Sequence, residues 1–197
     1  MKAAALMAAQ GTTLSPCREL VLGGQRSGKS RWAEDRAQAW LAQSPLHRVV
    51  LIATARASDD EMRQRVIRHQ ADRARRVPGI VTIEEPLHLA RAITAQSNVQ
   101  TMVVVDCLTL WLTNLLMPLD EAERAEPDVG ALQSAIAVAR GPLVLVGNEI
   151  GLGVIPMGRD VREFVDALGR TNQAVAKACD RVTFMAAGLP LTLKEPR

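Results

Sequence analysis

Eight consecutive residues near the N-terminus have the types and the spacing of a phosphate-binding loop. They are Gly23-Gly24-Gln25-Arg26-Ser27-Gly28-Lys29-Ser30, which fit the pattern G-x-x-x-x-G-K-[ST]. An apolar run precedes them and a helix-like stretch follows, as the pattern requires. In such a loop, backbone N–H groups turn toward one point at a helix N-terminus. The sequence predicts a nucleoside triphosphate site in which Lys29 reaches the β- and γ-phosphates and Ser30 holds Mg²⁺.

Three carboxylates stand where predicted strands end. Asp106 follows four apolar residues, and a carboxylate in this position beside a phosphate loop commonly orients Mg²⁺ or its water. It could instead start the helix that begins near Leu108. Glu84 and Glu85 end another predicted strand. One of them could accept hydrogen bonds from a ribose or a base, or either could simply favour the dipole of the next helix.

One histidine lies on a predicted helix in basic surroundings. A capping-box sequence predicts a helix that begins near Asp59. At 100° per residue, His69 and Arg73 share one stripe of it, with Arg65 at the border. Two arginines can dock phosphates and disfavour ring protonation, and a neutral imidazole can attack phosphorus. The pattern alone leaves an ordinary, partly buried histidine open. The other two histidines lack such surroundings and are interpreted as surface or structural residues: His47 and His88.

Short apolar runs alternate with helical patterns along most of the chain. The predicted strands span residues 19–22, 48–54, 81–84, 101–106, 143–147, 181–186 and 191–194. The predicted helices span residues 29–42, 59–76, 87–95, 108–116, 129–139 and 159–178. This alternation predicts a three-layer α/β, P-loop NTPase-like fold with a mostly parallel sheet. Gly188-Leu189-Pro190 predicts the turn of a C-terminal antiparallel hairpin.

Composition limits the function classes. The chain has 197 residues, 48% of them apolar and 23% charged, which is typical of a single globular domain. With the phosphate loop, this predicts one nucleotide-binding domain over residues 19–197, after an N-terminal extension of residues 1–18. The absence of Tyr and a 3% aromatic content disfavour a nucleic-acid partner. Three distant cysteines without C-x-x-C indicate no disulfide framework and no zinc site. The sequence predicts neither a signal peptide nor a membrane span, and hence a cytoplasmic protein.

Seven features, in order along the chain, resemble one known family. They are the phosphate loop, Ile52-Ala53-Thr54, Asp60-Glu61-Met62 with Arg65 and His69, Thr82-Ile83-Glu84-Glu85-Pro86, Val105-Asp106-Cys107-Leu108-Thr109 with Thr113-Asn114-Leu115-Leu116, Asn148-Glu149-Ile150-Gly151-Leu152-Gly153 with Pro156, and Gly169-Arg170 with Asn172-Gln173. From about Glu19 to Lys194, the chain resembles the bifunctional adenosylcobinamide kinase / adenosylcobinamide-phosphate guanylyltransferase family of cobalamin synthesis.

The resemblance implies two reactions. ATP or GTP phosphorylates adenosylcobinamide, and GTP then transfers GMP to adenosylcobinamide-phosphate through a guanylylated histidine, with release of pyrophosphate. The matching histidine is His69, and Lys29 serves both reactions. Mg²⁺ is the implied cofactor, with Ser30 and Asp106 as its ligands, and a homo-oligomer is implied. The implied nucleotide contacts are Gly23, Gly24, Gln25, Arg26, Ser27, Gly28, Lys29, Ser30, Thr54, Ala55, Arg56, Gln70, Ala71, Asp72, Arg73, Glu84 and Asp106.

The chain departs from the family pattern between Arg73 and Thr82. This stretch lacks an expected tryptophan and is longer than usual. Two other functions stay open beside the one that the resemblance implies. One is a P-loop small-molecule kinase without guanylyltransferase activity, and the other is a nucleotide-sensing module.

Overall fold

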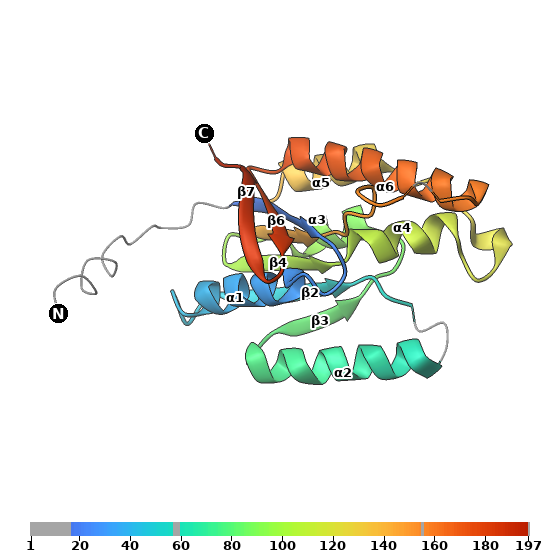
Figure 1. Cartoon of the computed structure of the whole chain (residues 1–197). Helices are drawn as coiled ribbons and strands as arrows, with labels where there is room; N and C mark the ends of the chain where they lie inside the picture. Colours follow the sequence, from blue (N-terminus) through green and yellow to red (C-terminus); the bar gives the residue numbers. More distant parts are fainter. Residues whose placement is uncertain (1–16, 57–59, 155, 197) are drawn as a thin grey trace.

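A mostly parallel sheet with helices on both faces organises the protein (Figure 1). The computed structural model describes residues 17–56, 60–154 and 156–196, without the side chains of residues 60–62, 65, 66 and 69. The described strands are β1 (Arg18–Gly23), β2 (Arg48–Ala53), β3 (Val81–Glu84), β4 (Thr101–Asp106), β5 (Leu143–Val146), β6 (Arg181–Ala186) and β7 (Leu189–Lys194). The described helices are α1 (Lys29–Leu41), α2 (Asp60–Arg76), α3 (Leu89–Gln96), α4 (Leu108–Leu116), α5 (Val129–Ala137) and α6 (Arg159–Ala178), with the short 3₁₀ helix η1 (Glu121–Glu123).

The described strands follow the order β3-β2-β4-β5-β1-β6-β7, and among them only β7 runs antiparallel to its neighbour. Central strands such as β4 and β5 are buried along almost their whole length, as expected for strands covered on both faces. Successive side chains point to opposite faces, so Leu20 and Leu22 pack in one apolar cluster and Val21 in another. Figure 1 shows α1 and α2 on one side of the sheet and α4, α5 and α6 on the other.

The register of the sheet places two parts of the candidate site at one level. Val21 of β1 and Asp106 of β4 both pair with Val146 of β5, which lies between them. Two strand spacings therefore separate Val21 from Asp106, which is about 9.5 Å. The chain leaves β1 for α1 and β4 for α4, on opposite faces. A crevice at such a change of direction is where ligands bind in open α/β sheets.

A buried carboxylate fixes α1 on the sheet. Glu19 in β1 is 3% exposed, and its Oε1 accepts hydrogen bonds from Trp32 Nε1 at 3.0 Å and from Thr183 Oγ1 at 2.7 Å. Its Oε2 lies 3.2 Å from Nε of Arg36. Because buried charges require partners, this cluster sets how α1 lies against β1 and β6. The position of the loop between β1 and α1 follows from it.

The C-terminal hairpin is confirmed, but its predicted turn is wrong. The turn is Ala187 and Gly188, both with positive φ, at 52° and 80°. Two such residues match the twist of the flanking strands. Pro190 lies inside β7, opposite Met185, and is tolerated because β7 is an edge strand. The described helices include none that is long and apolar enough to cross a membrane.

Candidate active site

The loop between β1 and α1 has the backbone conformation of a phosphate cradle. Gly23 and Gly28 adopt positive φ values of 153° and 104°. A Cβ on Gly23 would lie 2.3 Å from the carbonyl oxygen of Met185, so β6 leaves no room for a side chain there. The backbone N–H of Gly188 donates to the carbonyl of Ser27 at 2.9 Å, which packs the β6–β7 turn on the loop. Gly28 is the N-cap of α1 and has no side chain that could accept a hydrogen bond from the first turn of the helix.

Lys29 is buried at this loop. Its Nζ donates to the carbonyl oxygens of Gly23 at 2.9 Å and Gly24 at 2.6 Å. Burial lowers the pKa of the Lys29 ammonium below its ordinary value, while Cys107 and Asp106 act in the opposite direction. The cation predicted to contact the β- and γ-phosphates is therefore held at the cradle by the loop's own carbonyls.

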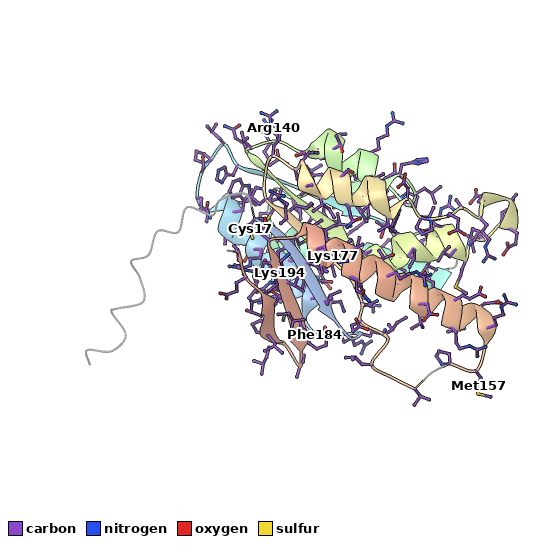
Figure 2. All side chains as sticks on the ribbon, turned by 90° about the horizontal axis from the view of Figure 1, so that it is seen from above. Cys17, Arg140, Met157, Lys177, Phe184 and Lys194 are labelled. Carbon is purple, nitrogen blue, oxygen red and sulfur yellow. The ribbon has the colours of Figure 1, made fainter. Side chains whose placement is uncertain are left out.

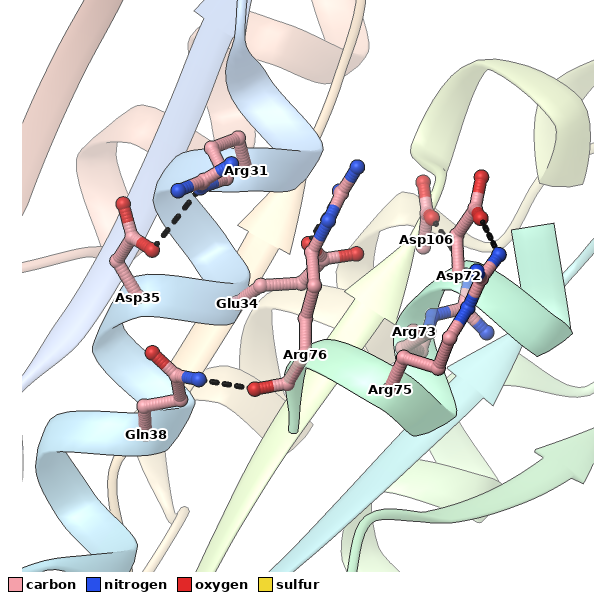
Figure 3. A network of polar contacts seen from close by, with 9 residues as sticks. All are labelled: Arg31, Glu34, Asp35, Gln38, Asp72, Arg73, Arg75, Arg76 and Asp106. Carbon is pink, nitrogen blue, oxygen red and sulfur yellow. Dashed lines mark hydrogen bonds and ion pairs between the residues drawn. The ribbon is translucent and has the colours of Figure 1, made fainter. Parts of the chain in front are cut away.

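An ion pair connects α2 to the end of β4. Nη2 of Arg73 lies 3.3 Å from Oδ2 of Asp106, and Arg73 is only 6% exposed (Figure 3). Both residues line a narrow pocket together with Ser30 of the phosphate loop and Glu34 of α1. Cys107, and not Asp106, is the N-cap of α4. The structure therefore places Asp106 toward α2 and the cradle and gives it no helix-capping role.

Three further contacts hold the C-terminal half of α2 on its neighbours. Arg76 Nη1 lies 2.8 Å from Glu34 Oε2 of α1, and Gln38 of α1 donates to the carbonyl of Arg76 (Figure 3). Gln70 Nε2 donates to Glu84 Oε1 at 3.4 Å. The other predicted contacts on α2 face solvent more: Ala71 is exposed, and Asp72 pairs with Arg75 at 2.6 Å. The carboxyl half of α2 therefore lies across the crevice edge of the sheet.

The side chain of His69 lies outside the described residues, as does that of Arg65. The structure places only the His69 backbone, in α2, four residues before Arg73. Residues four apart in a helix share a face, with Cβ atoms about 5–6 Å apart. Asp59, the predicted helix start, is also outside the described residues, and α2 begins at Asp60. The role of His69 stays a prediction.

Thr54 joins the ends of β2 and β4. Its Oγ1 donates to the carbonyl of Cys107 at 2.7 Å and accepts from the Cys107 N–H at 2.9 Å. Asn114 Nδ2 donates to the Thr54 carbonyl at 2.7 Å. Burial, with a smaller contribution from Asp106, raises the pKa of the Cys107 thiol to about 11. The thiol stays protonated at neutral pH and is a poor nucleophile, and the Thr54 side chain is occupied by the backbone.

An open cleft lies beside the cradle, at the ends of β2 and β3. Ala55, Arg56 and Glu84 line it, together with Asp120 and Glu123 from the segment after α4. Arg56 Nη1 lies 2.5 Å from Glu123 Oε2, and this ion pair spans the cleft. The residues of this segment are exposed, yet two of its carboxylates, Asp120 and Glu123, border the predicted nucleotide contacts.

The two consecutive glutamates at the end of β3, Glu84 and Glu85, have different roles. Oε1 of Glu85 accepts from the backbone N–H groups of Leu87 at 3.0 Å and His88 at 2.8 Å. Burial acts to raise the pKa of Glu85, but these hydrogen bonds and the nearby Arg91 lower it overall. Glu85 is thus the carboxylate of the helix start. Glu84 faces the cleft, where the sequence predicts a nucleotide contact.

Comparison with known proteins identifies the family. The family model described as "Cobinamide kinase / cobinamide phosphate guanyltransferase" matches residues 19–193. The chain belongs to this family. It is 48% identical over 177 residues to the bifunctional adenosylcobalamin biosynthesis protein CobP of Pseudomonas aeruginosa, covering 90% of this chain and 97% of that protein. It is 37% identical over 187 residues to CobU of Salmonella typhimurium, covering 89% and 98%.

A solved structure supports the fold alone. The flagellar accessory protein FlaH of Methanocaldococcus jannaschii superposes with a TM-score of 0.51 at 9% identity, covering 92% of this chain and 80% of that one. Together with the phosphate loop and the sheet order, this confirms the three-layer P-loop NTPase-like fold. For a member of the cobinamide kinase / cobinamide phosphate guanyltransferase family, the crevice at the end of β1 and β4 is the candidate active site.

The residues at this crevice fit Mg²⁺ with a nucleotide. Within the described ranges, no three His, Cys, Asp or Glu side chains gather into a metal site. Ser30 and Asp106 line the same pocket, and they offer a hydroxyl and a carboxylate oxygen. Mg²⁺ prefers oxygen ligands and typically takes one or two from the protein and others from phosphates. A site of two protein ligands therefore suits a metal that arrives with its nucleotide.

Glu34 and Glu123 were not among the residues predicted for the site. Each is a glutamate of the kind that usually lies at a protein surface. The partner of each is distant in the sequence: Arg76 is 42 positions from Glu34, and Arg56 is 67 positions from Glu123. No local pattern encodes such pairs.

His47 stacks on Trp40 with ring centroids 3.6 Å apart, and His88 is exposed, in agreement with their predicted structural or surface roles.

Replacement of Gly23 by alanine should lower nucleotide affinity about tenfold or more, because backbone strain of about 1–3 kcal/mol adds to the clash with β6. Fluorescent GTP titration measures this. Gly24→Ala is the matched control, since a Cβ on Gly24 meets no atom within 4 Å. Equal affinities of the two variants would contradict the account of the loop.

Arg73→Ala should loosen α2, because it removes the buried partner of Asp106. We expect backbone amides of α2 to exchange with deuterium about tenfold faster, as measured by mass spectrometry. Arg75→Ala is the control, since Arg75 is exposed and pairs with Asp72 of its own helix. The same acceleration in both variants would show that the ion pair does not hold the helix.

Proposed function

We propose that the protein phosphorylates adenosylcobinamide with ATP or GTP and then converts the product to adenosylcobinamide-GDP, with His69 as the covalent carrier of GMP. Membership in the family supports both activities. The observation that carries the proposal is the contact between Arg73 and Asp106, because it ties the helix that bears His69 to the edge where the phosphate loop lies. The family description, which names both activities, favours this function over a kinase without the second activity.

In the first reaction, the phosphate loop holds the β- and γ-phosphates. Lys29 and the N-terminus of α1 stabilise the negative charge that the γ-phosphoryl group carries during transfer. Ser30 and Asp106 would hold Mg²⁺, which neutralises phosphate charge when bound. The aminopropanol hydroxyl of adenosylcobinamide attacks the γ-phosphorus, and the bond to the β–γ bridging oxygen breaks. The hydroxyl proton is released, and the nucleoside diphosphate is the other product.

In the second reaction, a neutral His69 nitrogen attacks the α-phosphorus of GTP. The bond to the α–β bridging oxygen breaks, and pyrophosphate leaves at the phosphate loop beside Lys29. The guanylyl-histidine is a phosphoramidate, so an oxygen of adenosylcobinamide-phosphate can displace the imidazole and restore it. Two modest steps replace one encounter between two anions. Arg65 and Arg73 would screen their charges.

The remaining assignments follow the resemblance. The nucleotide contacts are those of the phosphate loop, residues 54–56, residues 70–73, Glu84 and Asp106. Residues 19–197 act as one nucleotide-binding domain behind an extension of residues 1–18, in the cytoplasm. In a homo-oligomer, the edge strand β7 would form part of the interface, since Leu189, Leu191 and Leu193 are 71%, 59% and 58% exposed. Exposed apolar strands of this kind favour a partner.

His69→Ala should abolish covalent labelling of the protein by GTP that is labelled at the α-phosphate, because the imidazole is the proposed nucleophile. In the wild-type protein the label should be lost in acid and kept in base, as for a phosphoramidate. The label is measured on denaturing gels. His88→Ala, at an exposed histidine outside the crevice, is the control and should label normally. An unlabelled wild-type protein would leave only the kinase.

Lys29→Ala should slow both reactions by about 10²-fold, because each needs the triphosphate held at the same loop. Rates of cobinamide phosphorylation and of guanylyl transfer to added cobinamide phosphate are measured separately. Arg31→Ala, at an exposed residue of the same helix, is the control and should keep both rates. Full guanylyl transfer by Lys29→Ala would refute a shared loop.

A further inference from the structure

The connection between β5 and α6 presents an apolar surface beside the phosphate loop. We propose that this surface, formed by Ile150, Leu152, Val154 and Met157, binds the corrin ring of the cobinamide substrate. The inference rests on the proposed function and assigns a part of the substrate to a part of the chain. Residues 148–153 and Pro156 of this segment are among the features that resemble the family, but no reaction step uses them.

The exposure of these side chains is unusual for their type. Leu152, Val154 and Met157 are 79%, 96% and 95% exposed, and Ile150 is 42% exposed. Residues 150–158 of the sequence contain no charged or hydrogen-bonding side chain, although 23% of the whole chain is charged. A contiguous group of exposed apolar side chains on a soluble protein commonly marks a binding surface. Figure 2 shows Met157 at the outer rim of the molecule, where the connection leads into α6.

The base of the connection is fixed to the candidate active site. The Glu149 N–H donates to the carbonyl of Gly23, the first residue of the phosphate loop, at 3.1 Å. The Asn148 N–H donates to Thr109 Oγ1 of α4 at 2.9 Å, and Asn172 Nδ2 of α6 donates to the Asn148 carbonyl at 3.1 Å. The apolar surface therefore begins directly at the cradle, and three elements determine its position.

The chemistry of cobinamide selects this side of the cradle. Its hydroxyl must come within about 3–3.5 Å of the γ-phosphorus, so the ring to which the hydroxyl arm is attached must lie next to the loop. The ring is broad and flat and is bordered by methyl groups and neutral amides. The opposite side of the cradle carries Arg56, Glu84 and Glu123, which would lose hydration under such a ring. The connection offers apolar contact without that cost.

The test combines Leu152→Ser, Val154→Ser and Met157→Ser in one full-length protein. We expect the KM for adenosylcobinamide to rise about tenfold or more, with kcat changed little, because the lost contacts are the same in the ground and transition states. The KM for the nucleotide and the guanylylation of the protein by GTP alone should be unchanged. Guanylylation needs no corrinoid and so reports that the cradle is intact.

The control combines Leu46→Ser, Val99→Ser and Val138→Ser. These residues are 63%, 56% and 65% exposed, and they lie at the opposite edge of the sheet, before β2, β4 and β5. An unchanged KM for adenosylcobinamide in the first variant would overturn the inference, and so would an equal rise in the control. A rise that accompanies loss of self-association in sedimentation velocity would also overturn it, because the surface would then join copies of the chain.

The outcome separates this inference from the proposed function. If the wild-type protein does not phosphorylate adenosylcobinamide, the proposed function fails and takes the inference with it. If the wild-type protein is active and the serine variant keeps its KM, only the placement of the ring fails. Equilibrium dialysis with adenosylcobinamide, read by its visible absorbance, checks the same difference in affinity without turnover.

Discussion

The ion pair between Arg73 and Asp106 is the contact on which the candidate site depends. It joins residues 33 positions apart, one from a helix beside the sheet and one from the end of a central strand. Arg73 is only 6% exposed, and its guanidinium needs a partner, because taking an unpaired charge out of water costs several kcal/mol. The carboxylate at the end of β4 is that partner. The carboxyl half of α2, and with it the backbone of His69, must therefore lie across the crevice.

The edge that receives α2 is set by the register of the sheet. β1 and β4 both pair with β5, so the start of the phosphate loop and Asp106 lie at the same level of the sheet. Thr54 then joins the ends of β2 and β4, and Glu19 fixes α1 on the sheet. Each of these contacts uses a buried polar group whose partner lies on another element. The rigidity of the edge follows from the cost of leaving such groups unpaired.

Local patterns were sufficient for the elements and the phosphate loop, because both follow from short-range spacing. All predicted strands and helices exist with shifts of a few residues. The predicted position of the hairpin turn is wrong, because Pro190 was assigned to the turn although an edge strand tolerates proline. Glu84 and Glu85 could not be distinguished, since their roles depend on the backbone of the next turn. The pairs of Glu34 with Arg76 and of Arg56 with Glu123 were not predictable, because no periodicity links distant residues. Where a tryptophan was expected after Arg73, the chain instead continues α2 to Arg76 and buries Val77.

In-line geometry explains why one cradle would need different elements on its two sides. A nucleophile must attack opposite the oxygen that leaves. For transfer of the γ-phosphoryl group, the leaving oxygen bridges β and γ, so the hydroxyl approaches from beyond the γ-phosphate. For transfer of GMP, the leaving oxygen bridges α and β, so the imidazole approaches from the nucleoside side. The two nucleophiles of the proposed function therefore come from opposite ends of one triphosphate. If the proposed function and the placement of the ring hold, a histidine on α2 and a corrin ring on the β5–α6 connection would meet this requirement without moving the phosphates from Lys29.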